Sequence, residues 1–302
     1  QWYYNYNRNT VAADARIWTG LTNGTIQFPD VTISGATTDN LVITGDLGQL
    51  STYQFYCKTT NETCSEYSNA AQFIAQPEPY FRTKQSGDWR LASTWEMSPN
   101  GTTGWIDACT YPWDTSSLSV EIRNGHQILI TEISTNTPDV KIDQLKILSG
   151  GELKVNSTAE LHLNNGTGID LFVQGTFYDQ GSSSGGNGVS FLDDAKWILD
   201  AGGTIIKSGN SSVIDYKDNF EGGIANIPAT AHWVYRKETT VLPSIVTNGM
   251  FYPNLYFEDT YTGGATYVLA GNTDFMTVKG SLFVGDTGQA VIVNNNNNFS
   301  TP

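Results

Sequence analysis

The sequence predicts an all-β protein, and three observations support this fold class. The 302 residues include 30 glycines, and aromatic residues make up 12% of the chain. Thr, Val, Ile and aromatic side chains fit the pleated surface of a sheet, whereas Gly and Asn mark turns. Short runs that alternate apolar and polar residues recur, and few windows carry the 3.6-residue period of an amphipathic helix. The length allows one large or two medium domains.

Residues 1–76 are expected to form a first unit of β-structure. Turn-rich stretches separate five strand-like runs, at residues 2–6, 25–28, 40–44, 52–59 and 70–75. Each run is rich in the β-branched and aromatic residues that favour strands. This unit is therefore predicted to be a small sheet protein in its own right.

Four segments of this unit carry a family resemblance. They are Trp2-Tyr3-Tyr4, Leu41-Val42-Ile43, Tyr53-Gln54-Phe55-Tyr56-Cys57 and Ser68-Asn69-Ala70-Ala71. Together they resemble an immunoglobulin-type domain that begins at the strand with the core tryptophan. The resemblance implies a β-sandwich without its first two strands, so upstream residues or another chain would cover the exposed sheet edges. Phe55 departs from the family pattern, because it stands where such domains often have the tyrosine of the tyrosine corner.

Two of the three cysteines flank a turn-like segment. Cys57 and Cys64 lie on either side of Asn61, so a disulfide across a hairpin is sterically reasonable. Two buried thiols, or partners in upstream sequence, are the alternatives. Cys109 has no adjacent histidine to activate it and is expected to be buried.

A second unit follows a proline-containing linker at residues 77–80. Over residues 81–293, alternating strands of three to five residues end at Gly, Asn or Asp, as at 140–142 and 153–155. Short strands at close, irregular repeats favour stacked coils over a hairpin meander. The sequence therefore predicts a parallel β-helix here. Two segments, 182–188 and 216–228, break the pattern and are expected to be loops that leave the stack.

This second unit also carries a resemblance. The segments are Ser86-Gly87-Asp88-Trp89, Ser93-Thr94-Trp95, Val120-Glu121-Ile122, Asn124-Gly125-His126, Leu145-Lys146-Ile147 and Gly150-Gly151-Glu152-Leu153-Lys154-Val155. They resemble the right-handed parallel β-helix modules of large bacterial cell-surface proteins, including cargo of the type 9 secretion route. The resemblance implies a secreted, adhesin-type protein, with other copies or neighbouring segments of a longer surface protein as partners.

Composition excludes some function classes. The formal net charge is −14 although only 15% of residues are charged, so nucleic-acid binding is not expected. No window approaches the roughly 18 consecutive apolar residues of a membrane span. The chain starts at Gln1 within a strand-like run, and we take it as a piece of a longer extracellular protein. The leading hypothesis is a non-enzymatic structural or adhesive segment, used as a stalk or filament component.

A polysaccharide-binding or polysaccharide-cleaving β-helix is the alternative. A lyase needs clustered carboxylates for a cation and a base to take the proton. Asp193 and Asp194 would hold calcium in a loop, or would form a solvated turn. His126, His162 and His232 lack the close spacing of a metal motif and are expected to be structural. No catalytic residue and no resident cofactor is predicted.

Other candidate residues concern sugars and the end of the chain. Trp89, Trp95, Trp105 and Trp113 would either stack on sugar rings or cap the open end of the β-helix. The run of asparagines in 294–302 is expected to be a tail or linker, with a stacked asparagine ladder as the alternative. Seven possible glycosylation sites begin at Asn23, Asn61, Asn100, Asn156, Asn165, Asn210 and Asn298.

Overall fold

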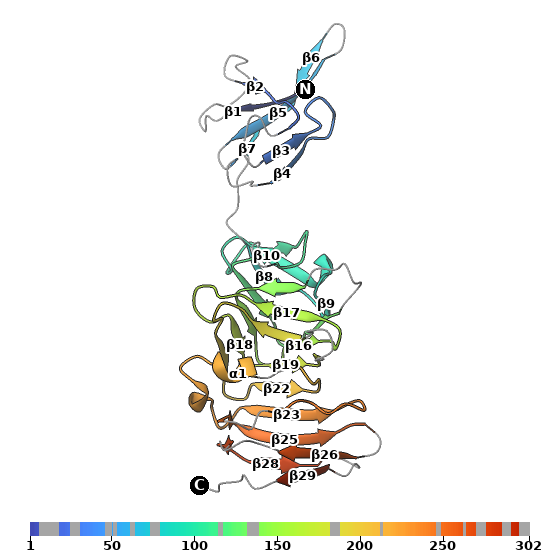
Figure 1. Cartoon of the computed structure of the whole chain (residues 1–302). Helices are drawn as coiled ribbons and strands as arrows, with labels where there is room; N and C mark the ends of the chain where they lie inside the picture. The colour runs from blue at the N-terminus through green and yellow to red at the C-terminus, as the bar shows by residue number, and fades with distance from the viewer. Residues whose placement is uncertain are drawn as a thin grey trace. The chain divides into compact units, whose positions relative to one another are not determined.

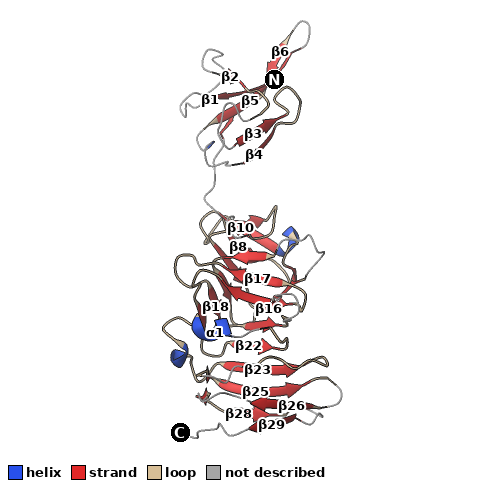
Figure 2. Ribbon diagram, viewed as in Figure 1, coloured by secondary structure: helices blue, strands red, loops and turns tan. Residues whose placement is uncertain are grey.

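The computed structural model is all-β with a few short helical turns (Figures 1 and 2). It describes residues 1–5, 18–24, 31–45, 50, 53–60, 64–72, 79–113, 117–131, 139–181, 188–211, 214–245, 249–261, 264–269, 276–285 and 291–295. The chain divides into two compact units, Gln1–Pro77 and Glu78–Pro302. The division falls at the predicted proline-containing linker, although Tyr80 already belongs to the first strand of the second unit.

The first unit contains two antiparallel sheets. One consists of β1 (Trp2–Asn5), β2 (Thr19–Gly20), β5 (Gln54–Thr60), β6 (Ser65–Tyr67) and β7 (Ala71–Gln72). The other is the pair β3 (Val31–Ser34) and β4 (Val42–Gly45). A small core, with Leu21, Val31, Ile33, Ala36, Leu50 and Phe55 as its buried members, lies among these strands. The predicted strand at 25–28 lies outside the described residues, whereas the other four expected runs each contain a strand.

No disulfide joins Cys57 to Cys64, so that expectation is not met. The hairpin pairs Thr60 with Ser65, and the backbone of Cys57 is hydrogen-bonded to Ser68. Cys64 therefore lies four positions from the residue opposite Cys57, which corresponds to roughly 13 Å along the strand. A disulfide requires Cα atoms within about 7 Å. Cys109 is exposed rather than buried.

The second unit is a parallel β-solenoid, as the short alternating strands predict. Successive rungs stack on one another in Figure 1, where β16, β22, β23 and β25 are labelled. Its longest sheet, sheet II, has eight parallel strands: β9 (Gly87–Asp88), β13 (Gln127–Ile130), β16 (Glu152–Val155), β19 (Thr176–Asp179), β22 (Thr204–Lys207), β23 (His232–Lys237), β25 (Asn254–Asp259) and β28 (Leu282–Val284).

Two further sheets complete the first coils. Sheet I contains β8 (Tyr80–Thr83), β12 (Ser119–Ile122), β15 (Leu145–Ile147), β18 (Leu171–Val173) and β21 (Trp197–Leu199). Sheet III contains β14 (Val140–Ile142), β17 (Glu160–Leu163) and β20 (Gly188–Phe191). The last two coils add the parallel pairs β24 (Phe251–Tyr252) with β27 (Thr277–Val278), and β26 (Ala265–Leu269) with β29 (Val291–Asn295).

Inward-facing side chains of equivalent strands stack in register. On sheet I, Leu145 pairs with Val120 on one side and Leu171 on the other, and all three are fully buried. Alternation of strand residues places every second side chain inside, so each coil contributes to one continuous apolar core. Full burial of each such side chain contributes about 1.5–3 kcal/mol. This ladder explains why strands of only three or four residues suffice.

The N-terminal end of the solenoid has a different structure. Strand β10 (Trp95–Ser98) pairs antiparallel with β8, and β11 (Ile106–Asp107) pairs antiparallel with β10. The 3-10 turn Ala92–Thr94 precedes β10. Sheet I therefore continues beyond its first parallel strand as an antiparallel extension.

The segment 216–228 leaves the stack only in part, contrary to the expectation of a loop throughout. It contains helix α1 (Ile214–Asp218) and the 3-10 turn Ile224–Asn226. Tyr216 is 1% exposed, and its ring packs at right angles to that of Trp197, with 5.4 Å between their centroids. Phe220 forms an isolated parallel β-bridge with Trp197. The apolar side chains of the segment thus fill the core, namely those of Tyr216, Phe220, Ile224 and Ile227, whereas residues 221–223 and 225–226 are exposed. Most of 182–188 lies outside the described residues.

The asparagine run is partly structured. Asn294 and Asn295 belong to β29, where they lie opposite Val268 and Leu269 of β26. The predicted tail therefore starts later than residue 294, and these two asparagines have no asparagine opposite them.

Candidate functional site

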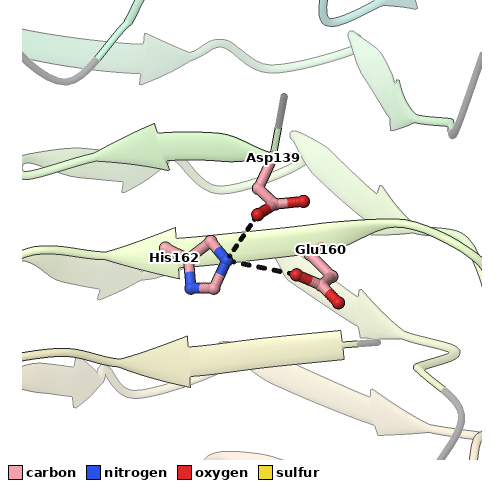
Figure 3. Close-up of side chains that lie close together, drawn as sticks. All are labelled: Asp139, Glu160 and His162. Carbon is pink, nitrogen blue, oxygen red and sulfur yellow. Dashed lines mark hydrogen bonds and ion pairs between the residues drawn. The ribbon is translucent and has the colours of Figure 1, made fainter. Parts of the chain in front are cut away.

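Two carboxylates and one imidazole meet on the outer face of sheet III (Figure 3). Glu160 and His162 are two residues apart on β17, and side chains at this spacing point to the same face of a strand. Leu161 and Leu163 alternate with them and are buried in the core. Asp139 directly precedes β14, whose Val140 lies opposite Leu161. Strand pairing between adjacent coils therefore brings Asp139 beside Glu160.

The three side chains converge on one ring nitrogen. His162 Nε2 lies 3.2 Å from Asp139 Oδ2 and 3.2 Å from Glu160 Oε2. The side chains of His162 and Glu160 are 18% and 22% exposed, and that of Asp139 is 44% exposed. Burial, and then the negative charge of Asp139, raise the pKa of the Glu160 carboxyl, which the His162 hydrogen bond partly offsets. Both carboxylates therefore face the same ring nitrogen.

The other ring nitrogen, His162 Nδ1, is buried and has no hydrogen-bond partner among the described residues. Imidazole and carboxylate donors are also the set that binds divalent transition metals. Within the described ranges, this is the sole group of three His, Cys, Asp or Glu side chains whose donor atoms come this close.

A second surface feature lies on the outer face of sheet II. A hollow of about 570 Å³ runs over β9, β13 and β16. Three charged side chains, Asp88, Glu152 and Lys154, contribute to its lining, which also includes Ser86, Gly87, Gln127, Ile128, Leu129 and Asn156. Lys154 Nζ lies 4.5 Å from the centroid of the Tyr178 ring on the next strand. Charges of both signs and hydrogen-bonding groups thus line one open groove.

The two remaining histidines make single hydrogen bonds. His126 Nδ1 lies 2.7 Å from Thr83 Oγ1, and burial, followed by the charge of Arg123, lowers the pKa of His126. His232 Nδ1 lies 3.1 Å from the Tyr256 hydroxyl. Neither belongs to a cluster of three metal-binding side chains in the described part of the chain.

Asp193 and Asp194 form a turn between β20 and β21. Both backbones are left-handed, with φ of 51° and 64°, and both side chains are exposed. Among the described residues they join no group of three ligand side chains, so the calcium alternative gains no support here.

The tryptophans divide into two pairs. Trp89 and Trp95 are 0% exposed and pack edge-on, with ring centroids 4.8 Å apart. Neither ring has an exposed face on which a sugar could stack, so sugar stacking is the wrong interpretation for this pair. Trp105 lies under the Arg82 guanidinium at 3.9 Å, and Trp113 packs against Tyr111. Arg82 and Tyr111 therefore already cover part of the half-buried rings of this second pair.

The possible glycosylation sites differ in exposure. Asn23, Asn100 and Asn165 are exposed, whereas Asn156 and Asn210 are half-buried. The amide nitrogens of Asn100 and Asn165 donate hydrogen bonds to Thr103 and to the carbonyl of Asp193. Asn61 and Asn298 lie outside the described residues.

The sequence contained one unused signal for the cluster. Glu160 and His162 alternate with two leucines, which places both on one strand face, and this pattern could have identified the pair. Asp139 is distant in sequence, and the pairing of β14 with β17 was needed to find it. The groove was likewise inaccessible to sequence reasoning, because its lining residues come from three coils, and Asp88 is distant in sequence from Glu152 and Lys154.

Comparison with protein-family models, curated proteins and solved structures finds no significant match to this chain. Within the described residues, no helix has the length and apolar character needed to cross a membrane.

Proposed function

We propose that this chain is a non-enzymatic structural and adhesive segment of a large extracellular bacterial surface protein. The observation that supports the proposal is sheet II, in which eight strands pair in parallel from β9 to β28 without interruption. A stack of parallel rungs gives length and stiffness, while its turns can vary without disturbing the core. These properties suit a stalk that holds other segments away from a cell.

The finer parts of the proposal rest on the resemblances. The first unit, with two antiparallel sheets around an apolar core, would be an immunoglobulin-like module. Export by the type 9 route and display as a filament or stalk follow from the resemblance of the second unit to bacterial cell-surface modules. Other copies, or neighbouring segments of a longer protein, would be the partners. Exposed Asn23, Asn100 and Asn165 are the accessible positions for glycans.

The adhesive role can be tested with intact cells that produce the protein. Protease treatment of intact cells should release peptides from residues 78–302 before any cytoplasmic marker appears. Deletion of the coding region for this chain should reduce cell attachment without changing growth. Recovery of the protein only after lysis, together with unchanged attachment, would contradict the proposal.

A polysaccharide-binding groove is the second candidate function. It is favoured by the convergence of Asp88, Glu152 and Lys154 along one open hollow on sheet II. Such groups can fix sugar hydroxyls or a uronic-acid carboxylate. A screen of acidic and neutral polysaccharides by affinity electrophoresis would test it. Lys154→Ala should reduce retardation, while Lys146→Ala, at an exposed position on sheet I, should not. Equal retardation of both variants would contradict a site in this groove.

A further inference from the structure

We propose that Asp139, Glu160 and His162 bind one zinc ion that links two adjacent coils of the solenoid. Asp139 belongs to the coil of β14, whereas Glu160 and His162 come from β17 on the next coil. A metal held by all three would add a cross-coil bond at the outer face of sheet III (Figure 3).

The donor spacing fits a tetrahedral ion. Zinc–nitrogen and zinc–oxygen bonds of about 2.1 Å place neighbouring ligand atoms about 3.4 Å apart in a tetrahedron. The two measured spacings, from His162 Nε2 to Asp139 Oδ2 and to Glu160 Oε2, are both 3.2 Å. All three donor atoms lie within 4.8 Å of one another. Asp139 is the most exposed of the three, so its carboxylate has room to close the site.

The charges at this position also favour the binding of a cation. Two carboxylates lie beside a single imidazole, each 3.2 Å from its Nε2 atom, and their like charges repel each other. A divalent ion would neutralise both carboxylates and bind the ring nitrogen that both of them face. The fourth position of the tetrahedron would then be open to water or to a ligand from outside.

The ligand types determine which metal is preferred. An imidazole nitrogen favours zinc and its transition-metal neighbours, whereas calcium and magnesium prefer oxygen donors alone. Three protein ligands also provide too few oxygens for calcium, which takes about six to eight. Calcium and magnesium are therefore expected to compete weakly.

The buried Nδ1 atom of His162 determines the expected affinity. A metal-bound histidine usually donates its second ring N–H to an acceptor, and loss of such a partner weakens metal binding about 10- to 100-fold. His162 Nδ1 has no partner among the described residues. We therefore expect zinc to bind about 10- to 100-fold more weakly here than at a site whose histidine has such a partner.

Isothermal titration calorimetry of the full chain, stripped of metal and with its cysteines alkylated, tests the proposal. Alkylation is needed because Cys64 and Cys109 are exposed and thiolates bind zinc. The expected result is one zinc per chain and no heat with calcium. Zinc at about 100 times the dissociation constant should raise the midpoint of thermal unfolding by about 5 °C.

Three variants assign the binding to these residues. Glu160→Gln and His162→Gln should each weaken zinc binding at least tenfold. His232→Gln is the matched control, since His232 is also a half-buried, hydrogen-bonded histidine on a strand, and it should bind zinc like the unmodified sequence. Absence of binding at 1 mM zinc, or equal binding by the control and by both cluster variants, would overturn the proposal. Circular dichroism would establish that each variant is folded.

Discussion

Asp179 and Lys207 occupy the same inward-facing position on adjacent rungs of sheet II, and Lys207 Nζ donates a hydrogen bond to Asp179 Oδ2 over 2.7 Å. Both side chains are 0% exposed, in a column that otherwise contains Ile130, Val155, Tyr235 and Phe257. Lys207 also bonds to Ser211, and the Tyr216 hydroxyl donates to Asp179 over 3.2 Å. A buried, hydrogen-bonded ion pair thus replaces two apolar residues in the ladder.

The first prediction concerns this ion pair. Lys207→Met should reduce the free energy of unfolding by about 3–5 kcal/mol, because it leaves a buried carboxylate without its counter-charge. Urea denaturation would measure the loss. The double variant Asp179→Leu/Lys207→Met should recover most of it, because two apolar side chains of similar size can replace a buried pair. A loss below about 1 kcal/mol, the range of exposed ion pairs, would mean that the pair is solvated in solution.

The second prediction concerns the stacking of inward-facing residues. Leu145→Ala should cost about 2–5 kcal/mol, because it leaves a cavity between Val120 and Leu171. Its neighbour Lys146 on the same strand is exposed, and Lys146→Ala should change stability by less than about 0.5 kcal/mol. Chemical denaturation of both variants gives the comparison. Similar costs at the two positions would contradict the assigned strand faces.

The third prediction concerns a glycine at the corner between sheets I and II. A Cβ atom on Gly175 would lie 2.3 Å from the carbonyl oxygen of Gly151 and 2.4 Å from that of Leu148. Gly175→Ala should therefore push two coils apart and cost about 1–3 kcal/mol. Gly20→Ala is the control, because the nearest atoms to its Cβ would be 3.7 Å away. Equal thermal stability of the two variants would refute a close approach of coils at Gly175.

The fourth prediction concerns pH in the absence of metal. The folded-state pKa of Glu160 is raised above its ordinary value of 4.5, so the folded chain binds more protons than the unfolded chain just above that pH. The contribution of Glu160 to the free energy of unfolding therefore becomes more unfavourable as pH rises from about 4.5 to its raised pKa. Glu160→Gln removes this titration.

Thermal unfolding of the metal-free chain and of Glu160→Gln, between pH 4 and pH 8, tests the sign of this effect. The stability of the variant relative to the unmodified chain should increase as pH rises through that window, then stay constant. A relative stability that falls with rising pH would show that the carboxylate form is favoured in the folded state.

The sequence was sufficient for the solenoid because its signal is local. Alternation such as Leu153-Lys154-Val155, preceded by glycines and followed by Asn156, indicates strand, face and turn without knowledge of any partner strand. Core residues that break the alternation were harder to predict. Asp179 and Lys207 appear as surface residues in the sequence, and only their pairing across one coil makes their burial possible.

Other features depended on the register between coils, which sequence periodicity does not determine here because the coils differ in length. Leu145 pairs with Leu171, whereas Val140 pairs with Leu161, so the spacing varies from sheet to sheet. The segment 216–228 resembled a loop for a related reason. Its apolar residues Tyr216 and Phe220 follow no strand alternation, yet they fill the core, Tyr216 from a short helix and Phe220 from the turn after it.

The most direct test of the central claim is the size of the native protein isolated from the cells that make it, by intact mass spectrometry combined with light scattering. If the chain is a segment of a long surface protein, the native species should be much larger than 33.0 kDa. The larger mass would come from a continuous polypeptide or from assembled copies. A discrete 33.0 kDa monomer that remains monomeric at high concentration would contradict the claim.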